Sequence, residues 1–417
     1  MVMPDSLFLI TLVMPKLNDS RMLQDFFAAI ETPDEKVVGQ PLDNRFSSGA
    51  SGNLSGNMCS NAAALLKRSL MTEYYWRDLH DRDNSWQGLE LVLRHQRVQG
   101  RGLEMLSGHC GRMVLRLNKE PLYWGTMLKD HSGAWLVFNA DHSGSGSLLP
   151  PVTSADVERM NNRQDTTRIR EWCRYFARQL ASASEGLLPP SRWILRPMTA
   201  GQRHTPRICK EAEPGANWCF CSPESTGNLG FDWHLESRDF PDLLNPEKIT
   251  LVDWWWSESP LLATRAVKPN SGRVKWWRKK SRERALPPVL VWYIGGFGAY
   301  LIIDGHSRLQ AAVEEKIPPQ FLVLSGLMER EFSPDPQAAA RTLRGLEQQL
   351  STNRRCSIQG VNQTLINLYD TRYLYSATYS RATLGNEDAW ANDVLSYINK
   401  HQLTDKWGAI FGRISEQ

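Results

Sequence analysis

The sequence predicts an α+β protein, in which a mixed N-terminal region of unknown fold precedes a small α/β unit and a helical tail. Apolar runs bounded by Gly and Pro alternate with stripes of helical spacing, most regularly in the last third. At 417 residues the chain exceeds one ordinary core, so we expect several domains. We place an N-terminal mixed domain at 1–190, a loop-rich connector at 191–240, an α/β domain at 241–330 and a mostly helical extension at 331–417.

The composition is that of a folded globular protein. Apolar residues make up 41% and charged residues 23% of the chain, which excludes a disordered class. Seven scattered cysteines, an odd number, argue against a disulfide framework. The apolar run at 7–14 is too short to cross a bilayer, and Asp5 lies where a secretory signal carries positive charge. We therefore expect a buried strand at 7–14 and a cytoplasmic protein without membrane contact.

The N-terminal region is predicted to contain both helices and strands. A Ser-, Gly- and Asn-rich stretch at 47–57 is typical of a flexible linker. Apolar residues at three- and four-residue steps predict a helix from 61 to about 99. Strand-like runs follow at 113–117 and 134–138, and the region 156–183 predicts one or two helices. A single apolar stripe runs along the latter: Ile169, Trp172, Cys173, Phe176, Leu180 and Ala181.

The C-terminal part is predicted to form a small α/β unit followed by helices. Proline pairs and a glycine-rich turn set its boundaries. The expected elements are a strand at 248–253, a hairpin of strands 289–294 and 299–303 around a glycine turn, a helix at 307–315, a strand at 320–324, and helices at 337–350 and 388–400.

The turn between the second hairpin strand and the helix is the most informative part of the chain. It reads Asp304-Gly305-His306-Ser307-Arg308 and places a helix N-terminus beside polar side chains, a setting that suits an anion. Gly305 allows close approach of backbone N–H groups, Ser307 can cap the helix or contact phosphate, and Arg308 offers a planar cationic fork. His306 can donate a hydrogen bond or act as acid or base, and Asp304 can hold Mg²⁺ or orient His306.

A purely structural interpretation of the same turn stays open. Asp304 and Ser307 are residue types that commonly cap helices at strand–helix junctions. Arg308 would then pair with Glu314 or Glu315 on the same helix.

This stretch resembles the ParB/sulfiredoxin-like superfamily over roughly residues 246–325. The pattern of strand, Asp-Gly-His-x-Arg turn and Ala-rich helix looks like that of ParB-like nuclease-fold proteins and free-serine kinases. The resemblance implies binding of ATP or another nucleotide with Mg²⁺, and phosphotransfer or nucleotide hydrolysis. His306 stands where sulfiredoxins carry a reactive Cys, and no helix-turn-helix DNA reader is evident after Ser325, so neither redox chemistry nor chromosome partitioning is implied.

A catalytic carboxylate is sought upstream, by similarity to the kinase branch. Glu258 and Asp253 flank a tryptophan run and are the candidates for a general base, with Glu258 the favoured position. The alternative is that both are solvated loop charges.

A basic segment at 265–284 carries nine Lys or Arg and one acid, a local charge of +8 in a chain of net charge +4. Basic residues beside Trp276 and Trp277 predict contact with a nucleic acid or an acidic partner, or else a solvated rim. The candidate contact residues are Arg273, Lys275, Arg278, Lys279 and Lys280.

Two further function classes remain open. The uncharacterised N-terminal region and the sixteen Trp favour a non-catalytic, immunity- or antitoxin-like factor that binds a protein partner. The basic segment favours a DNA-associated ParB-like protein or nuclease.

One group of residues has metal-ligand chemistry: His204, Cys209, Cys219 and Cys221. These residues lack the paired Cys-x-x-Cys knuckles of zinc sites, so we interpret the thiols as buried and inert.

Overall fold

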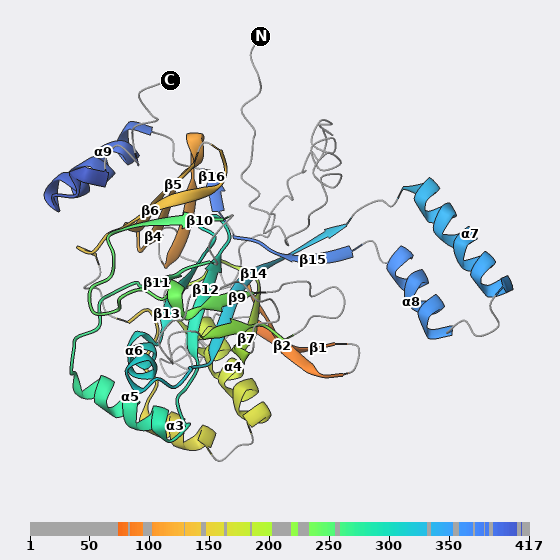
Figure 1. The fold of residues 1–417 in the computed structure, drawn as a ribbon, viewed down its shortest axis with the longest axis horizontal. Helices are drawn as coiled ribbons and strands as arrows, with labels where there is room; N and C mark the ends of the chain where they lie inside the picture. Colours follow the sequence, from red (N-terminus) through yellow and green to blue (C-terminus); the bar gives the residue numbers. More distant parts are fainter. Residues whose placement is uncertain are drawn as a thin grey trace, which may run out of the picture. The chain divides into compact units, whose positions relative to one another are not determined.

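The structure is a computed structural model (Figure 1). It describes residues 74–81, 84–94, 102–128, 130–142, 147–161, 165–183, 186–201, 218–223, 233–254, 259–331, 335–352, 358–369, 372–378, 380–382, 387–406 and 410. The expected strand at 7–14 and the expected linker at 47–57 lie outside these ranges.

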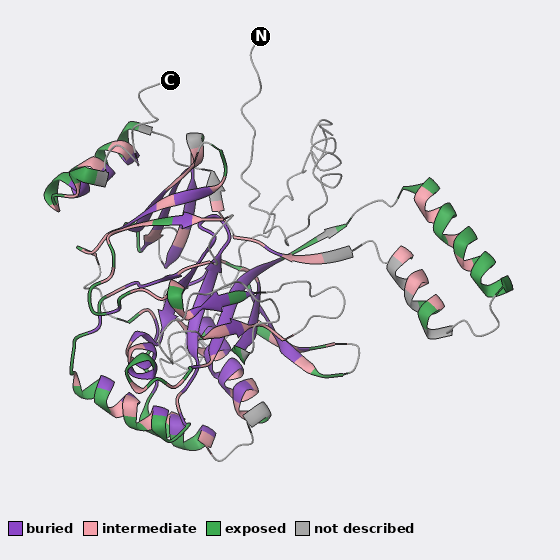
Figure 2. Ribbon diagram, viewed as in Figure 1, coloured by how far each residue is buried: buried purple, intermediate pink, exposed green. Residues whose placement is uncertain are grey.

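The larger of two sheets has ten strands in the described part of the chain. Its main path runs β1 (Tyr74–His80), β2 (Trp86–Leu93), β7 (Ser191–Gly201), β14 (Phe321–Glu331), β12 (Val289–Ile294), β13 (Ala299–Asp304) and β11 (Leu261–Leu262). Off this path, β15 (Arg372–Ser376) pairs with β14, and β8 (Cys219–Cys221) lies between β7 and β9 (His234–Glu236). Every residue of β12 and β13 is buried, as expected for strands covered on both faces (Figure 2).

Two inner strands of the smaller sheet, β4 (Arg112–Leu117) and β6 (Gly133–Phe138), are almost fully buried, because alternate residues along the sheet pack in two clusters. The order of this sheet is β10 (Ile249–Asp253), β6, β5 (Glu120–Met127), β4, β3 (Leu103–Ser107) and β16 (Ser380–Ala382). Tyr123 and Leu136 join the main core, whereas Val114, Trp124 and Val137 pack in a second cluster. This alternation is the two-residue period of a pleated strand.

Helices cover these sheets at three places. Their bounds are α3 (Ser154–Asn161), α4 (Asp165–Ser182), α5 (Gly272–Arg282), α6 (His306–Glu315), α7 (Pro336–Thr352), α8 (Ile358–Tyr369) and α9 (Glu387–Lys400). Helix α4 packs on β2 and β7, α5 packs on α6, and α9 covers the second face of the smaller sheet. Helix α7 has no buried residue among those described and is mostly green in Figure 2. None of the described helices has the length and apolarity needed to cross a membrane.

Much of the expected secondary structure is confirmed. The hairpin β12–β13, the helix α6 and the parallel strand β14 occur where the sequence predicts them, although β14 continues to Glu331. The stripe on α4 is buried throughout. Strands β4, β6 and β10 and helices α7 and α9 are confirmed as well, with ends that shift by one or two residues.

Two expectations about the arrangement of helices and strands are wrong. The helix expected at 61–99 is replaced, in its described part, by the antiparallel strands β1 and β2. Leu89, Leu91 and Leu93 occupy every second position of β2 and are buried. Glu90, between the first two, is also buried and forms ion pairs with Arg77 and Arg192. This charged residue therefore does not lie on a solvent-exposed face.

The segment 191–240, expected to be a connector, contains β7 in the middle of the larger sheet. Strand β7 pairs with β2 on one side and with β14 on the other. Both sheets therefore combine described strands from before and after residue 190.

Candidate anion-binding site

Helix α6 begins directly after β13, and Gly305 makes the turn between them. Its φ of 116° lies in the left-handed region, where a Cβ is strained. A Cβ here would also lie 3.2 Å from the Val289 backbone and 3.0 Å from the Arg308 guanidinium. The first intrahelical bond runs from the Leu309 N–H to the Gly305 carbonyl at 2.9 Å. The N–H groups of residues 306–308 therefore have no acceptor within the helix.

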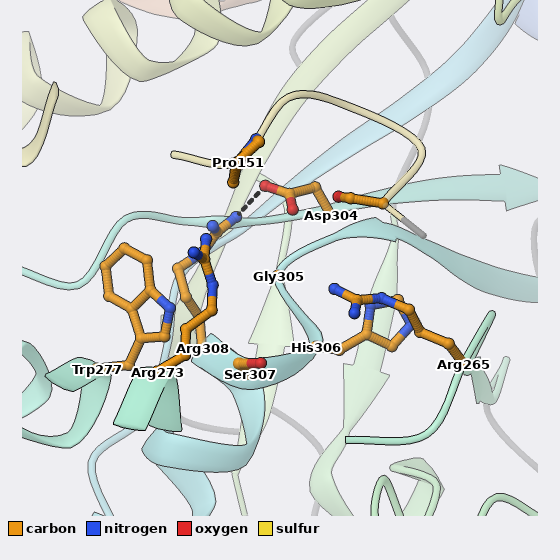
Figure 3. Close-up of a pocket in the computed structure, with 10 residues that line it drawn as sticks. Pro151, Arg265, Arg273, Trp277, Asp304, Gly305, His306, Ser307 and Arg308 are labelled. Atoms are coloured by element: carbon orange, nitrogen blue, oxygen red, sulfur yellow. Dashed lines mark hydrogen bonds and ion pairs between the residues drawn. The ribbon is translucent and has the colours of Figure 1, made fainter. Parts of the chain in front are cut away.

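A cavity of ≈ 200 Å³ opens at this helix N-terminus (Figure 3). Residues from four separate segments line it: Ser147 and Pro151, then Arg265, then Arg273 and Trp277 of α5, and finally the turn from Asp304 to Arg308. All five residues of the sequence motif thus line one cavity.

Arg308 is held in place by a buried ion pair. Its Nη2 donates to Asp304 Oδ2 at 2.9 Å and to the Pro288 carbonyl at 3.0 Å. The guanidinium also lies against the rings of Phe176 and Trp277, with its central carbon 5.9 and 5.5 Å from their centroids. Its buried Nε has no hydrogen-bond partner. Arg308 is therefore oriented by the protein while one donor stays unsatisfied.

His306 is buried and neutral. The Thr264 N–H donates to its Nε2 at 3.1 Å, so the proton of the neutral ring is on Nδ1. The buried Nδ1 has no partner. Burial, and then the nearby Arg265 and Arg308, lower the pKa of His306 to about 3. The ring therefore acts as a neutral donor, because its basic nitrogen is occupied by Thr264 and the imidazolium is disfavoured.

The cavity has an excess of positive charge. Arg265, Arg273 and Arg308 line it, and Asp304 is the acid among its lining residues. Figure 3 shows the Arg265 guanidinium beside the His306 ring and that of Arg273 near Arg308. Although Arg273 is largely exposed, partial burial and then Arg308 lower its pKa. Like charges held this close attract an anion that relieves their repulsion.

The Mg²⁺ ion expected at Asp304 does not suit this arrangement. The carboxylate is already neutralised by Arg308, and the two other arginines at the cavity repel a divalent cation. Asp304 also does not orient His306, which is hydrogen-bonded to Thr264 instead. The chemistry of the lining side chains favours an anion.

Of the two carboxylates expected upstream, Asp253 does not line this cavity. Glu258 lies outside the described residues, and Asp253 ends β10 in the smaller sheet. The structural alternative paired Arg308 with Glu314 or Glu315, but Arg308 pairs with Asp304 instead. Both glutamates form ion pairs with Arg278 of α5.

Helix α5 carries the basic segment, and several of its charges are already paired. Arg282 joins Arg278 on Glu315, and Lys279 and Lys280 pair with Glu283. Lys275 is exposed. Of the five contact residues expected here, Arg273 is the one that lines the cavity. Ion pairs within the protein thus already engage three of the five candidate contact residues.

Sequence reasoning missed Arg265, Trp277 and Thr264 as parts of this site. Arg265 and Trp277 lie within the basic segment that the sequence singles out, but a linear pattern does not tell which side chains turn toward α6. Nothing in the sequence marks Thr264, whose role depends on β11 lying parallel to β13.

Comparison of the chain with protein-family models, curated proteins and solved structures gives no match. The resemblance to the ParB/sulfiredoxin-like superfamily therefore stays a prediction. The strand, turn and helix that carry the resemblance are present, but such an order does not fix an activity.

Proposed function

We propose that the protein binds the phosphate group of a nucleotide in the cavity at the start of α6, and that it acts as a nucleotide-dependent phosphotransferase or hydrolase. The observation that carries this proposal is the convergence of Arg265, Arg273 and Arg308 on the open N-terminal end of α6. Free N–H groups at a helix N-terminus beside an excess of cationic side chains form a site that suits an anion.

The cavity volume limits how much of a nucleotide the protein can enclose. At ≈ 200 Å³ it is smaller than the roughly 300 Å³ or more of pockets that bury a drug-sized ligand. It suits a phosphate group and the atoms next to it. The rest of a nucleotide would extend past Arg273, the exposed arginine at the cavity.

The side chains support binding and electrostatic stabilisation of a phosphoryl group. Arg308 is pre-oriented by Asp304, and His306 donates as a neutral ring, so neither must reorganise when the ligand arrives. Phosphoryl transfer depends mainly on such positioning and charge stabilisation. His306 is a poor general base, since its pKa is about 3. A base would have to come from another residue, and Glu258 remains the candidate predicted from the sequence.

Ligand binding to the purified chain tests the proposal. ATP, ADP, AMP and inorganic phosphate are each titrated, with and without Mg²⁺, by calorimetry and by thermal shift. We expect Arg273→Gln to weaken phosphate-bearing ligands by about tenfold or more, the loss of one charge-assisted contact. Lys275→Gln is the matched control, because Lys275 is exposed on the same helix and does not line the cavity.

The outcomes separate the alternatives. Equal losses in both variants would indicate non-specific attraction to helix α5. Absence of binding by every nucleotide and by phosphate would refute the proposal. The protein-binding alternative is based on the N-terminal region 1–190 and on the sixteen Trp, and residues 1–73 of that region lie outside the described ranges. Capture of a protein partner that His306→Ala leaves unchanged would support that alternative.

A further inference from the structure

Strands β8 and β9 bring two thiols and an imidazole together on one face, far from the anion cavity in sequence. Cys219 and Cys221 are two residues apart on β8, so their side chains point to the same side. The antiparallel register places His234 directly opposite Cys221. Together the ligand atoms of these three residues lie within 4.8 Å of one another.

The opposite face of the same two strands is fixed in the core. Phe220 and Leu235 are both fully buried. The Phe220 ring packs edge-on against Phe321, with centroids 4.9 Å apart, and stacks on Phe240 at 6.0 Å. Because this face is anchored, the thiols and the imidazole are held on the accessible face, where Cys219 and Cys221 are half-buried and His234 is exposed.

Two of the three ligand–ligand distances are close to those around a tetrahedral metal ion with sulfur and nitrogen ligands. The two Sγ atoms are 3.8 Å apart, and Cys221 Sγ lies 3.3 Å from His234 Nδ1. Zinc bonds of about 2.3 Å to sulfur and 2.0–2.1 Å to nitrogen, at tetrahedral angles, require separations of about 3.8 Å and about 3.5 Å. A disulfide requires a sulfur–sulfur distance of about 2.05 Å, so these residues are thiols.

We propose that Cys219, Cys221 and His234 form a zinc site. Two thiolates and one imidazole are ligands that Zn²⁺ prefers, and their negative charge offsets that of the ion. Three protein ligands leave the fourth tetrahedral position for water or another ligand. The interpretation of these thiols as buried and inert is wrong in its first part, because both are partly accessible.

The hydrogen bonds around the cluster agree with this assignment. Glu236 lies opposite Cys219 and on the same face, but its carboxylate pairs with Arg238 at 2.8 Å. We therefore assign the metal to the three residues whose ligand atoms converge. Strands β8 and β9 have three residues each, so an ion that joins them would also stabilise their pairing.

Metal binding by the full chain tests the site. The protein is stripped with a chelator under reducing conditions, and Zn²⁺ or Co²⁺ is then titrated. We expect about one tightly bound Zn²⁺ per chain and, with Co²⁺, a thiolate-to-metal charge-transfer band. His234→Ala is expected to weaken zinc affinity by at least about tenfold. Loss of a residue that only orients a metal ligand already costs about that much, and loss of the ligand itself should cost no less. Cys221→Ser is expected to reduce the cobalt band by about half, because one of two thiolates remains.

Two control variants make the result specific. His80→Ala removes another exposed histidine, from β1, and Cys173→Ala removes a fully buried thiol of α4. Both are expected to bind zinc like the unmodified chain. Because His234 is exposed, its variant keeps the core intact and stays informative even if Cys221→Ser fails to fold. Failure of the unmodified chain to bind zinc, or equal binding by His234→Ala, would overturn the assignment.

Discussion

The Arg308 guanidinium lies 2.9 Å from the Asp304 carboxylate, and their side chains are only 1% and 6% exposed. The two residues are four positions apart, across the turn from β13 into α6. A buried ion pair contributes little net stability, because desolvation offsets the attraction, but removing one partner leaves a charge uncompensated. The pair therefore fixes the direction of Arg308 more than it stabilises the fold.

Asp304→Asn should lower stability while strengthening anion binding. The unpaired Arg308 cation costs about 3–5 kcal/mol when buried. The same change removes the negative charge at the cavity, so phosphate affinity rises. Denaturant unfolding measures the first effect and calorimetric titration the second. In the double variant Asp304→Leu/Arg308→Met stability should recover and phosphate binding should be lost. Parallel losses of stability and affinity in Asp304→Asn would contradict this account.

Gly305→Ala should destabilise the protein by about 1–3 kcal/mol, the range for a strained left-handed residue. The new Cβ would press on Val289 and on the Arg308 guanidinium, so phosphate affinity should fall as well. Chemical denaturation and phosphate titration measure the two effects. Gly272→Ala is the control, because a Cβ at the start of α5 meets nothing within 4 Å. Similar stability of the two variants would show that the turn is not constrained.

His306 should make the protein less stable as the pH falls. Its pKa is about 3 in the folded chain, against an ordinary value of 6.5. Between these values the unfolded chain binds more protons, so stability decreases from about pH 6.5 toward pH 3, with a slope of at most about 1.4 kcal/mol per pH unit. His306→Gln, which keeps an acceptor for Thr264 but cannot titrate, should flatten that part of the profile. Urea unfolding across this range makes the comparison, and an unchanged profile would count against a buried neutral His306.

Helix α9 should depend on Trp390 for its attachment to the smaller sheet. The buried indole N–H donates to the Met113 carbonyl at 3.1 Å, and the ring belongs to the second cluster. Trp390→Ala should cost about 3–5 kcal/mol. Asp393→Ala, on the exposed face of the same helix, should change stability by less than about 0.5 kcal/mol. Thermal unfolding of both variants measures the difference, and equal midpoints would mean that α9 is not anchored by this contact.

Sequence reasoning succeeded where the controlling interactions are local. The β12–β13 hairpin and the start of α6 follow from glycines and prolines that act within a few residues, and the α4 stripe follows from helical spacing. The start of a helix at the five-residue turn was predictable for the same reason, whereas the cavity beside it also depends on residues from three other segments.

It failed where distant strands decide the outcome. Glu90 is a charged residue within the apolar run of β2, and its ion partner Arg192 comes from the distant strand β7. His234 is 13 residues from Cys221 in the chain, and pairing of β8 with β9 is what brings them to 3.3 Å. The spacing of residues along the chain does not predict which distant strands pair.

The central position of β7 has a practical consequence for dissecting this protein. A fragment of residues 241–330 would lack the neighbour of β14, and a fragment ending at residue 190 would lack the neighbour of β2. Each fragment would expose unpaired backbone N–H and C=O groups along an apolar strand, and it would therefore tend to aggregate. Deletion mapping would then report insolubility in place of lost activity, so the roles of the two halves are better separated by single-residue changes in the intact chain.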